Sequence, residues 1–203
     1  MANDETPTRI QLKNRALILE AGLEVFSAEG FRGATLDGIA QAAGLSKPNV
    51  LYYFGSKEAI YRDLLARLLD TWLDPLRDLD PEGEALEELL AYVRRKLVLA
   101  RDYPRESRLF AGEILRGAPH LEEELAGDLR RLVDARARVI RAWMDAGALA
   151  ACDPHHVIFS IWALTQHYAD FDVQVRAVLG PDRDPWIEAE RELDVHFRRV
   201  LTA

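Results

Sequence analysis

Polar and basic side chains that could contact nucleic acid gather between residues 33 and 58. Lys47 and Asn49 carry donors that reach base edges and phosphates, and Tyr52 or Tyr53 would be presented outward by the same short helix. Hydroxyl residues precede three apolar runs, as helix N-caps do, and helix N-termini offer free N–H groups to phosphate oxygens. Together these features predict a DNA-contacting surface formed by Thr35, Ser46, Lys47, Asn49, Tyr52, Tyr53 and Lys57.

A second group of such residues lies in the longest stretch without a charged side chain, Pro154 to Ala169. Helical spacing places Trp162, Thr165 and Gln166 on one face. A side-chain amide is planar and carries both donors and an acceptor. Gln166 can therefore pair with one edge of a flat heterocycle while a tryptophan covers the face of the ring. The alternative is a core glutamine that bonds to a neighbouring main-chain group.

The elements that must position these residues are helical. Apolar residues recur at spacings of three and four along the chain, and no segment alternates with period two for long. The pattern predicts a first helix that contains Leu12 and stops at Glu29-Gly30, a second over Leu36 to Ala43, and a third from Ser46 to Tyr53. Pro48 lies in the first turn of the third helix, where its missing N–H costs little.

Asp-Pro pairs divide the rest of the chain. Asp80-Pro81, Asp153-Pro154 and Asp184-Pro185 each precede an apolar run, and each predicts a helix with Asp as N-cap and Pro as its first residue. The pair Asp74-Pro75 instead lies inside the helix that starts after Gly55-Ser56, and it should end or kink that helix. Further helices are expected near 82–101, 105–116, 120–147, 154–179 and 186–201.

The two short helices are joined by the turn Gly44-Leu45-Ser46 and form a helix-turn-helix. Ala40 is small where the helices would cross, and Ile39 and Val50 are among the apolar residues that fill the seam beneath. The expected fold class is all-α, with a helix-turn-helix head over residues 1–55 and a helical ligand-binding and dimerisation bundle over residues 56–203.

Composition and charge narrow the class of protein. The 203 residues are 49% hydrophobic and 30% charged, which is typical of a globular chain. A single cysteine, Cys152, excludes an internal disulfide framework and a cysteine-based metal cage. The polar segment Met1 to Arg9 predicts no signal peptide, and the uncharged stretch is too short to span a bilayer, so we expect a soluble cytoplasmic protein.

The charge balance is acidic even though a DNA-binding surface is predicted. The net charge is −8, and the first 60 residues hold six Lys or Arg against seven Asp or Glu, a balance of −1. Because phosphates respond to the charges on one face, the position of the basic residues matters more than the total. The balance predicts only modest non-specific affinity for DNA.

Residues 33–58 resemble the head of the TetR family of one-component repressors. The shared pattern is Gly-x-Thr…Ile-Ala…Ala-Gly-x-Ser…Leu-Tyr-x-Phe…Ser-Lys-Glu, which runs here from Gly33 to Glu58. One departure is Pro48, where the family more often has Gly, Thr or Ala, and this change bears on base choice. The resemblance implies a TetR-like fold and a homodimer that places two recognition helices in successive major grooves of a pseudo-palindromic operator.

Over about residues 12–180 the chain is similar to the uracil-responsive pyrimidine-utilisation repressors of that family. The segments that carry the similarity include Arg101-Asp-Tyr-Pro, Ser107-Arg-Leu-Phe and the run from Ile161 to Phe171. The resemblance implies a pyrimidine pocket lined by Trp162 and Gln166 with Trp72 and Leu73 opposite. From the residues themselves, Phe110 is a candidate aromatic wall or core residue, and Asp170 a candidate acceptor or dimer-interface residue. The expected effector-binding set is Trp72, Leu73, Phe110, Trp162, Thr165, Gln166 and Asp170.

These observations predict a dimeric, ligand-gated regulator, most simply a repressor of pyrimidine utilisation that senses uracil. The alternative within this class responds to a different small aromatic or heterocyclic effector. The last two helices, 154–179 and 186–201, are expected to pair with their copies in the dimer.

Catalysis and metal binding have little support in the sequence. A rival class is an all-helical enzyme or sensor subunit in which residues 33–58 are structural, but no GxGxxG, P-loop, HExxH or GxSxG pattern is present. Cys152-Asp153-Pro154-His155-His156 resembles a metal cluster on paper. Adjacent histidines on a helix point about 100° apart, however, so neither a metal nor a cofactor is expected.

Overall fold

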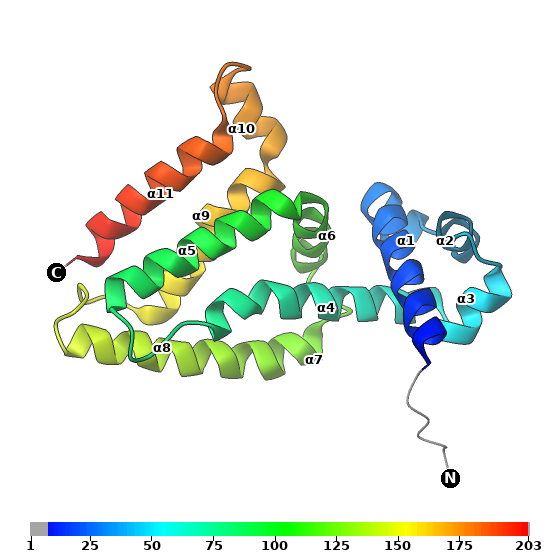
Figure 1. Ribbon diagram of the computed structural model, residues 1–203, viewed down its shortest axis with the longest axis horizontal. Helices are drawn as coiled ribbons and strands as arrows, with labels where there is room; N and C mark the ends of the chain where they lie inside the picture. Colours follow the sequence, from blue (N-terminus) through cyan, green and yellow to red (C-terminus); the bar gives the residue numbers. More distant parts are fainter. Residues whose placement is uncertain (1–7, 203) are drawn as a thin grey trace, which may run out of the picture. The chain divides into compact units, whose positions relative to one another are not determined.

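The computed structural model of the protein describes residues 8–202, and every regular element within that range is a helix (Figure 1). The chain forms two compact units. The first comprises the chain up to Leu68 together with Gly112–Leu121, and the second comprises Leu69–Ala111 and the chain from Glu122 onward. The boundary expected at residues 55 and 56 stays a prediction, because this grouping joins the first part of the fourth helix to the head.

The first unit begins with the predicted helix-turn-helix. It contains α1 (Arg9–Gly33), α2 (Leu36–Ala43), α3 (Lys47–Phe54) and the first part of α4 (Lys57–Arg77). The apolar residues expected in the seam are buried, with Ile39 and Val50 fully enclosed. The helix α1 is interrupted at Gly30, where φ is 69°, and then continues for one turn beyond the expected stop.

Caps and a left-handed residue set the angle between α2 and α3. Thr35 Oγ1 accepts a hydrogen bond from Gly38 N at 3.0 Å, and Ser46 Oγ accepts one from Asn49 N at 3.4 Å, which confirms both predicted N-caps. Gly44 ends α2 with φ of 65°, a conformation that side chains with a Cβ rarely adopt. The position of the N-terminus of α3 is therefore set by a hydroxyl cap and a glycine that are recognisable in the sequence.

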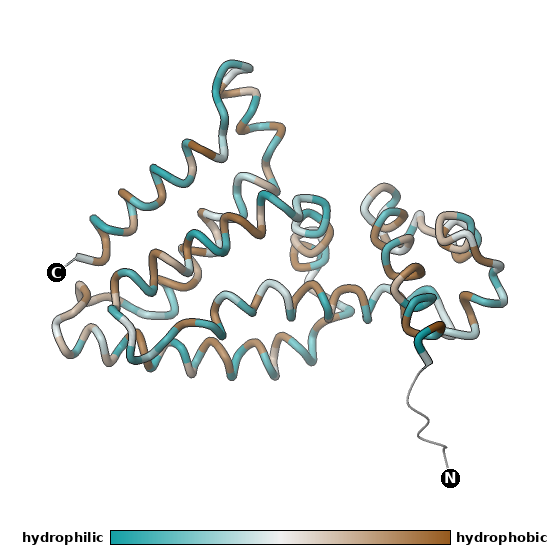
Figure 2. The backbone as a smooth tube through the Cα atoms, in the orientation of Figure 1, coloured by the Kyte–Doolittle hydropathy of each residue, from teal (hydrophilic) through white to brown (hydrophobic). Residues whose placement is uncertain are grey.

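The second unit is a helical bundle. Its helices are the end of α4, then α5 (Ala85–Asp102), α6 (Pro104–Leu115), α7 (Glu122–Glu124), the π-helical turn η1 (Leu125–Leu129), α8 (Arg130–Asp145), α9 (Pro154–Asp170), α10 (Asp172–Leu179) and α11 (Pro185–Leu201). Figure 2 shows apolar and hydrophilic residues alternating in short runs along α5, α8 and α11, as amphipathic helices require. The buried sides of these helices and of α9 form one apolar core. Within residues 8–202 no helix is long and apolar enough to cross a membrane.

The Asp-Pro predictions are right at two positions and wrong at one. Asp153 and Asp184 cap α9 and α11, and the following prolines are the first residues of those helices. Asp80 does not cap α5, which begins only at Ala85. Its carboxylate instead accepts a hydrogen bond from Glu82 N at 3.0 Å, so the segment makes a turn before the helix starts.

One other helix boundary differs from that expected, and another agrees with the expectation. The helix predicted over 154–179 is broken at Phe171, which separates α9 from α10. The helix α4 ends at Arg77, two residues after Pro75. This outcome matches the expectation that proline would end or kink the helix.

A buried carboxylate links the segment Gly112–Leu121 to the rest of the first unit. The Glu113 side chain is 1% exposed. It accepts hydrogen bonds from His120 N at 3.0 Å and from Tyr61 Oη at 3.1 Å, and it lies 2.9 Å from His120 Nδ1. The rings of Tyr61 and His120 both pack against Phe31 at the end of α1. The last turn of α6 is thereby fastened to α4 and α1.

Candidate nucleic-acid interface and effector site

The exposed side of α3 presents the expected polar side chains. Tyr52 is 73% exposed, and Asn49 and Lys47 are exposed as well. Lys47 Nζ lies 2.9 Å from Asp37 Oδ2 on α2, so its charge is partly neutralised. Exposed pairs of this kind are worth about 0–1 kcal/mol and exchange readily for another anion. The face is therefore able to offer Lys47 to a phosphate at little cost.

Two of the predicted DNA-contacting residues are held by contacts inside the head. Tyr53 Oη accepts a hydrogen bond from Asn14 Nδ2 at 2.8 Å, and its carbonyl accepts one from Arg15 at 2.9 Å. Lys57 Nζ donates to the carbonyl oxygens of Phe31 and Ala34, each at 2.7 Å. Their contact with DNA stays a prediction, and the geometry gives both an anchoring role. Sequence reasoning missed Asn14 and Arg15 because their partners lie far along the chain.

The second unit contains a buried polar cluster that joins three helices. Lys96 on α5 is only 3% exposed, and its ammonium donates to Trp72 O on α4 at 3.4 Å. The same ammonium lies 5.2 Å from the centre of the Trp72 ring. Trp72 is itself buried, and its indole N–H has no hydrogen-bond partner in the part of the chain that the structure describes. Burial lowers the pKa of Lys96 to about 8, although the charge of Asp170 opposes this shift.

Asp170 closes the cluster at the end of α9. Its Oδ1 accepts a hydrogen bond from the fully buried Ser107 hydroxyl on α6 at 2.6 Å, and Arg108 donates to the carbonyl of Ala169 next to it. Burial raises the pKa of the Asp170 carboxyl above its ordinary value, against the hydrogen bond from Ser107 and the charges of Arg108, His167 and Lys96. An acid at this position is also disfavoured by the negative end of the helix dipole. Keeping the Asp170 carboxylate ionised in the folded chain therefore costs free energy.

The face of α9 predicted to bind the effector has one unused amide. Trp162 Nε1 donates to Tyr92 Oη on α5 at 2.6 Å, and the Thr165 hydroxyl donates to the carbonyl of Ile161 in its own helix at 2.6 Å. Gln166 is half-buried, and its amide makes no hydrogen bond within residues 8–202. The indole of Trp162 and the hydroxyl of Thr165 are therefore occupied, and Gln166 remains available to pair with a ligand.

The remaining predicted effector residues are Leu73 and Phe110, and their contact with an effector stays a prediction. Leu73 follows Trp72 on α4 and Phe110 lies one turn after Ser107 on α6, and both are buried. Sequence reasoning missed Lys96, although it left a signal. Lys96 occupies a position of α5 that the helical spacing of Leu89, Val93 and Ala100 assigns to the buried side, where a lysine is rare.

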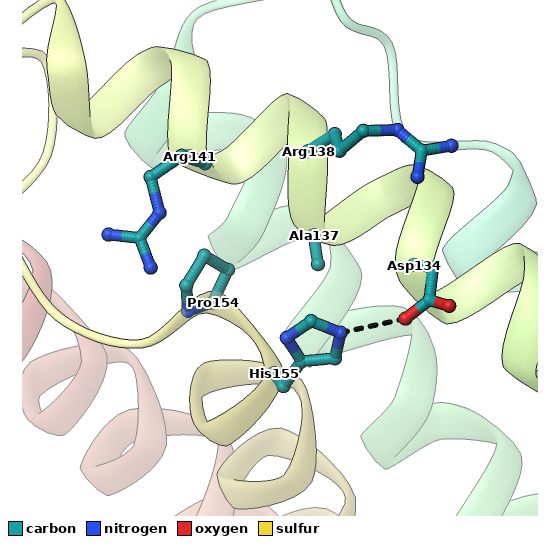
Figure 3. Close-up of a pocket in the computed structure, with 6 residues that line it drawn as sticks. All are labelled: Asp134, Ala137, Arg138, Arg141, Pro154 and His155. Carbon is teal, nitrogen blue, oxygen red and sulfur yellow. Dashed lines mark hydrogen bonds and ion pairs between the residues drawn. The ribbon is translucent and has the colours of Figure 1, made fainter.

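A separate hollow lies on the surface between α8 and the start of α9 (Figure 3). It has a volume of about 240 Å³ and is lined by Asp134, Ala137, Arg138, Arg141, Pro154 and His155. His155 Nε2 is paired with Asp134 Oδ1 at 2.9 Å, and Figure 3 shows the two arginines pointing in different directions. The backbone N–H groups at the start of α9 are capped by Asp153. These contacts fasten α8 to α9 and leave no convergent set of ligand-binding groups.

Comparison with known proteins covers both regions. The model of bacterial regulatory proteins of the tetR family matches residues 18–64, and the model of the C-terminal region of YcdC-like proteins matches residues 65–199. The HTH-type transcriptional regulator RutR of Escherichia coli (strain K12) is 50% identical over 171 residues, which are 84% of this chain and 80% of that protein. The HTH-type transcriptional repressor NicS of Pseudomonas putida is 30% identical over 154 residues, 72% of this chain and 70% of that one.

Solved structures show the same architecture. A bacterial regulatory protein in the tetR family from Rhodococcus RHA1 superimposes with a TM-score of 0.73 at 25% identity, over 94% of this chain and 98% of that one. The two family models together match residues 18–199, a range that contains the helix-turn-helix and Lys96.

Proposed function

This chain belongs to the TetR family of bacterial regulatory proteins, and from that premise we propose that it is a dimeric repressor of pyrimidine-utilisation genes gated by uracil or a related pyrimidine. It is a helix-turn-helix transcriptional regulator, so α3 is its recognition helix. Two observations support the choice of effector: the buried indole N–H of Trp72 has no partner in the described residues, and the half-buried Gln166 amide makes no hydrogen bond there. Such groups cost free energy unless a ligand satisfies them.

On DNA, the exposed side of α3 enters the major groove. Lys47, Asn49 and Tyr52 contact base edges and phosphates, and the helix N-termini capped by Thr35 and Ser46 contact the backbone. Tyr53 and Lys57 hold α3 and the start of α4 in place for these contacts. The net charge of −8 weakens non-specific attraction to DNA, so tight binding requires a sequence that fits the exposed face of α3 well.

The dimer forms through α9 and α11. These two helices leave large apolar side chains exposed in the single chain, including Phe159 at 45% and Ile187 at 69%. Exposed apolar side chains on helices that pack against each other are typical of association surfaces. A two-fold axis along this surface presents two copies of α3 to half-sites about 34 Å apart.

The effector site lies in the second unit, between Trp72 on α4 and Gln166 on α9. A pyrimidine dione is a small flat ring whose edge alternates carbonyl acceptors with N–H donors, and the Gln166 amide complements one such edge. The rings of Trp72 and Trp162 provide apolar cover for its faces. Micromolar affinity, roughly −8 kcal/mol, is within the ceiling for a ligand of about eight heavy atoms.

Gating follows from the topology of α4 and α6. Each of these helices contributes residues to both compact units, so a ligand held against Trp72 acts on a helix whose first part belongs to the unit that carries the head. The effector shifts DNA affinity by its differential affinity for the two arrangements of the heads in the dimer.

Calorimetric titration with uracil tests the effector, with thymine and cytosine as comparisons. Saturable binding is expected, reduced roughly tenfold or more in Gln166→Ala, because the amide contributes paired hydrogen bonds. Gln174→Ala, on the exposed side of α10, is the matched control and should bind as the parent does. A folded protein that binds no pyrimidine would reject the pyrimidine effector and favour the alternative of another small heterocycle.

Selection from a random DNA pool followed by gel-shift assays tests the DNA-binding role. Lys47→Ala and Tyr52→Ala should lose affinity for the selected DNA while their circular dichroism stays unchanged. Arg130→Ala, at an exposed position of α8 outside the proposed dimer helices, should retain that affinity. Recovery of no bound sequence by the folded dimer would contradict operator binding. Repeating the assay with uracil shows whether the effector releases the DNA or holds it.

A further inference from the structure

An acidic side chain lies beside the residues of the head that are proposed to contact DNA. Asp37 is in the first turn of α2, and its side chain is 72% exposed. Its Oδ2 lies 2.9 Å from the ammonium of Lys47, which is the first residue of α3. Because α3 is the recognition helix, the carboxylate is within hydrogen-bond distance of a side chain proposed to contact DNA. Asp37 has no part in the contacts expected from the sequence.

A free carboxylate at this position would oppose DNA binding, because the phosphates of DNA repel an acid on the docking face. Two local interactions favour an acid here in the free protein. One is the positive end of the α2 dipole, and the other is the exposed ion pair with Lys47. Both are weak at an exposed site. They do not explain why an acid, rather than a neutral polar residue, lies next to the recognition helix.

Lys47 removes this electrostatic obstacle and leaves one carboxylate oxygen available. The ammonium is paired with Oδ2, so the two side chains together carry no net charge. Asp37 Oδ1 makes no hydrogen bond within residues 8–202. The ammonium keeps two further N–H donors for a phosphate. Asp37 therefore presents one free acceptor, Oδ1, while its other oxygen is held against α3.

The major groove contains few donors for such an acceptor. The amino groups of cytosine and adenine are donors there, whereas guanine and thymine present carbonyl oxygens. Aspartate and glutamate side chains accept characteristically from cytosine N4. A guanine or thymine at the same place would put a carbonyl oxygen against a carboxylate oxygen with no proton between them. The free oxygen of Asp37 can therefore discriminate a base with an amino group from a base with a carbonyl group.

We propose that Asp37 determines operator specificity by reading a cytosine, with Oδ1 accepting a hydrogen bond from the N4 amino group while Oδ2 stays paired with Lys47. This inference rests on the docking of α3 in the proposed function and adds a base-reading residue from α2. In the proposed dimer, one such position occurs in each half-site, and the two-fold axis relates the two positions. Replacing that cytosine by guanine or thymine in one half-site should weaken binding roughly 10- to 100-fold.

Selection from a random DNA pool tests this assignment when the full-length parent and two variants are compared. Asp37→Ala should lose the preference for cytosine at one position of each half-site and keep the preferences of the parent at the other positions. Asp145→Ala is the matched control, because it removes the same charge from an exposed site at the end of α8, and it should select the motif of the parent throughout. Circular dichroism verifies that each variant is folded.

A base analogue distinguishes a direct contact from a general effect of charge. 2-Pyrimidinone lacks only the amino group of cytosine. Placed at the position that depends on Asp37, it should weaken gel-shift binding of the parent roughly tenfold or more, as expected for loss of a hydrogen bond to a charged group. The affinity of Asp37→Ala should not change with this substitution. A purely structural or electrostatic role of Asp37 would make parent and variant respond alike to the analogue.

The possible results separate this assignment from the proposed function. An Asp37→Ala variant that keeps the motif of the parent at every position, whatever its overall affinity, would overturn the base contact and leave operator binding intact. Equal loss of affinity for the analogue in parent and variant would overturn it as well, and so would a preference for guanine or thymine that depends on Asp37. Recovery of no sequence by the folded parent would reject operator binding and the base contact together.

Discussion

Lys47 and Lys57 both belong to the DNA-binding head, and their ammonium groups have different partners. Lys47 pairs with the exposed Asp37, whereas Lys57 donates to two main-chain carbonyls at the end of α1 and lies 4.7 Å from the Phe31 ring. Lys57→Met should lower the free energy of unfolding by about 1–3 kcal/mol, because it leaves those carbonyls unpaired. Lys47→Met should change it by less than about 0.5 kcal/mol. Urea unfolding measures both.

The same two variants should differ on DNA. Lys47→Met removes a phosphate contact, so the slope of log affinity against log salt should fall by about one for each head. Lys57→Met, assayed at a temperature where it is folded, should keep the salt slope of the parent. A loss of slope in Lys57→Met instead would show that its ammonium leaves the carbonyls to contact DNA.

The buried charge of Lys96 predicts how stability depends on pH. Its pKa is about 8 in the folded chain against an ordinary 10.5, so the folded state holds this proton less tightly than the unfolded state. Below pH 8 the charged form penalises folding, by up to roughly 3 kcal/mol. As pH rises from 8 to 10.5 the folded state loses the proton first and the penalty disappears.

Lys96→Met should therefore be more stable than the parent at pH 7, by about 1–3 kcal/mol after allowance for the lost attraction to Asp170. The difference should shrink as the pH rises above 8. Urea unfolding of parent and variant across this range measures it in the absence of ligand. A constant difference at all pH values would show that Lys96 is not titrating in the folded protein.

At the residue scale, local chemistry was predictable and long-range pairing was not. Thr35 and Ser46 cap their helices because a hydroxyl before an apolar run has few other functions. The anchoring of Tyr53 depends on Asn14, a residue 39 positions away, and the periodicity of a helix does not reveal such a partner. The sequence shows Lys96 only as a charged residue on the apolar side of the helix now called α5. It does not show that Asp170 interacts with Lys96 electrostatically.

At the scale of elements, the segment Gly112–Leu121 depends on one carboxylate. Burial by itself would raise the pKa of the Glu113 carboxyl. Hydrogen bonds from His120 and Tyr61 outweigh burial and hold this pKa below its ordinary value. Burial, together with the Glu113 charge, raises the pKa of Tyr61 to about 12. Because the folded-state pKa of Glu113 is depressed, its contribution to stability is complete above pH 4.5 and is lost as the pH falls below that value.

Glu113→Ala should lower the free energy of unfolding by about 2–4 kcal/mol, since it leaves Tyr61 and His120 without their shared acceptor. Glu123→Ala, an exposed acid in α7, is the control and should cost under about 1 kcal/mol. Thermal and urea unfolding at neutral pH report both values. Equal losses in the two variants would mean that the buried cluster contributes nothing beyond an ordinary surface acid.

Helix boundaries were predicted correctly where the capping residue does not form a turn instead. Asp153 and Asp184 cap their helices as the Asp-Pro pattern predicts, but Asp80 does not. Its carboxylate accepts a hydrogen bond from Glu82 N and its carbonyl accepts one from Gly83 N, so the segment forms a turn instead. The break at Phe171 was not predicted. The apolar periodicity continues through Val175, and no glycine or proline marks the end of α9.

At the scale of the whole molecule, net charge and oligomeric state act on DNA binding together. A chain with a charge of −8 gains little from non-specific attraction, so in the proposed dimer the affinity for an operator comes from two heads bound at once. Joining two binding events raises the affinity by roughly 10²- to 10⁴-fold over one event alone. The proposed dimer surface on α9 and α11 is therefore a determinant of DNA binding even though it contacts no DNA.

Charges introduced on the proposed dimer surface should disrupt the dimer and thereby lower DNA affinity without changing the DNA-binding heads. Phe159→Glu combined with Ile187→Glu places four carboxylates in the proposed interface of each dimer, and burying unpaired charges there costs more than the contact returns. Gel filtration with light scattering should show a monomer, and gel-shift affinity for the selected DNA should fall roughly 10²- to 10⁴-fold. Leu115→Glu, at a position 85% exposed on α6, is the control and should remain a dimer. A double variant that still runs as a dimer would place the interface elsewhere on the molecule.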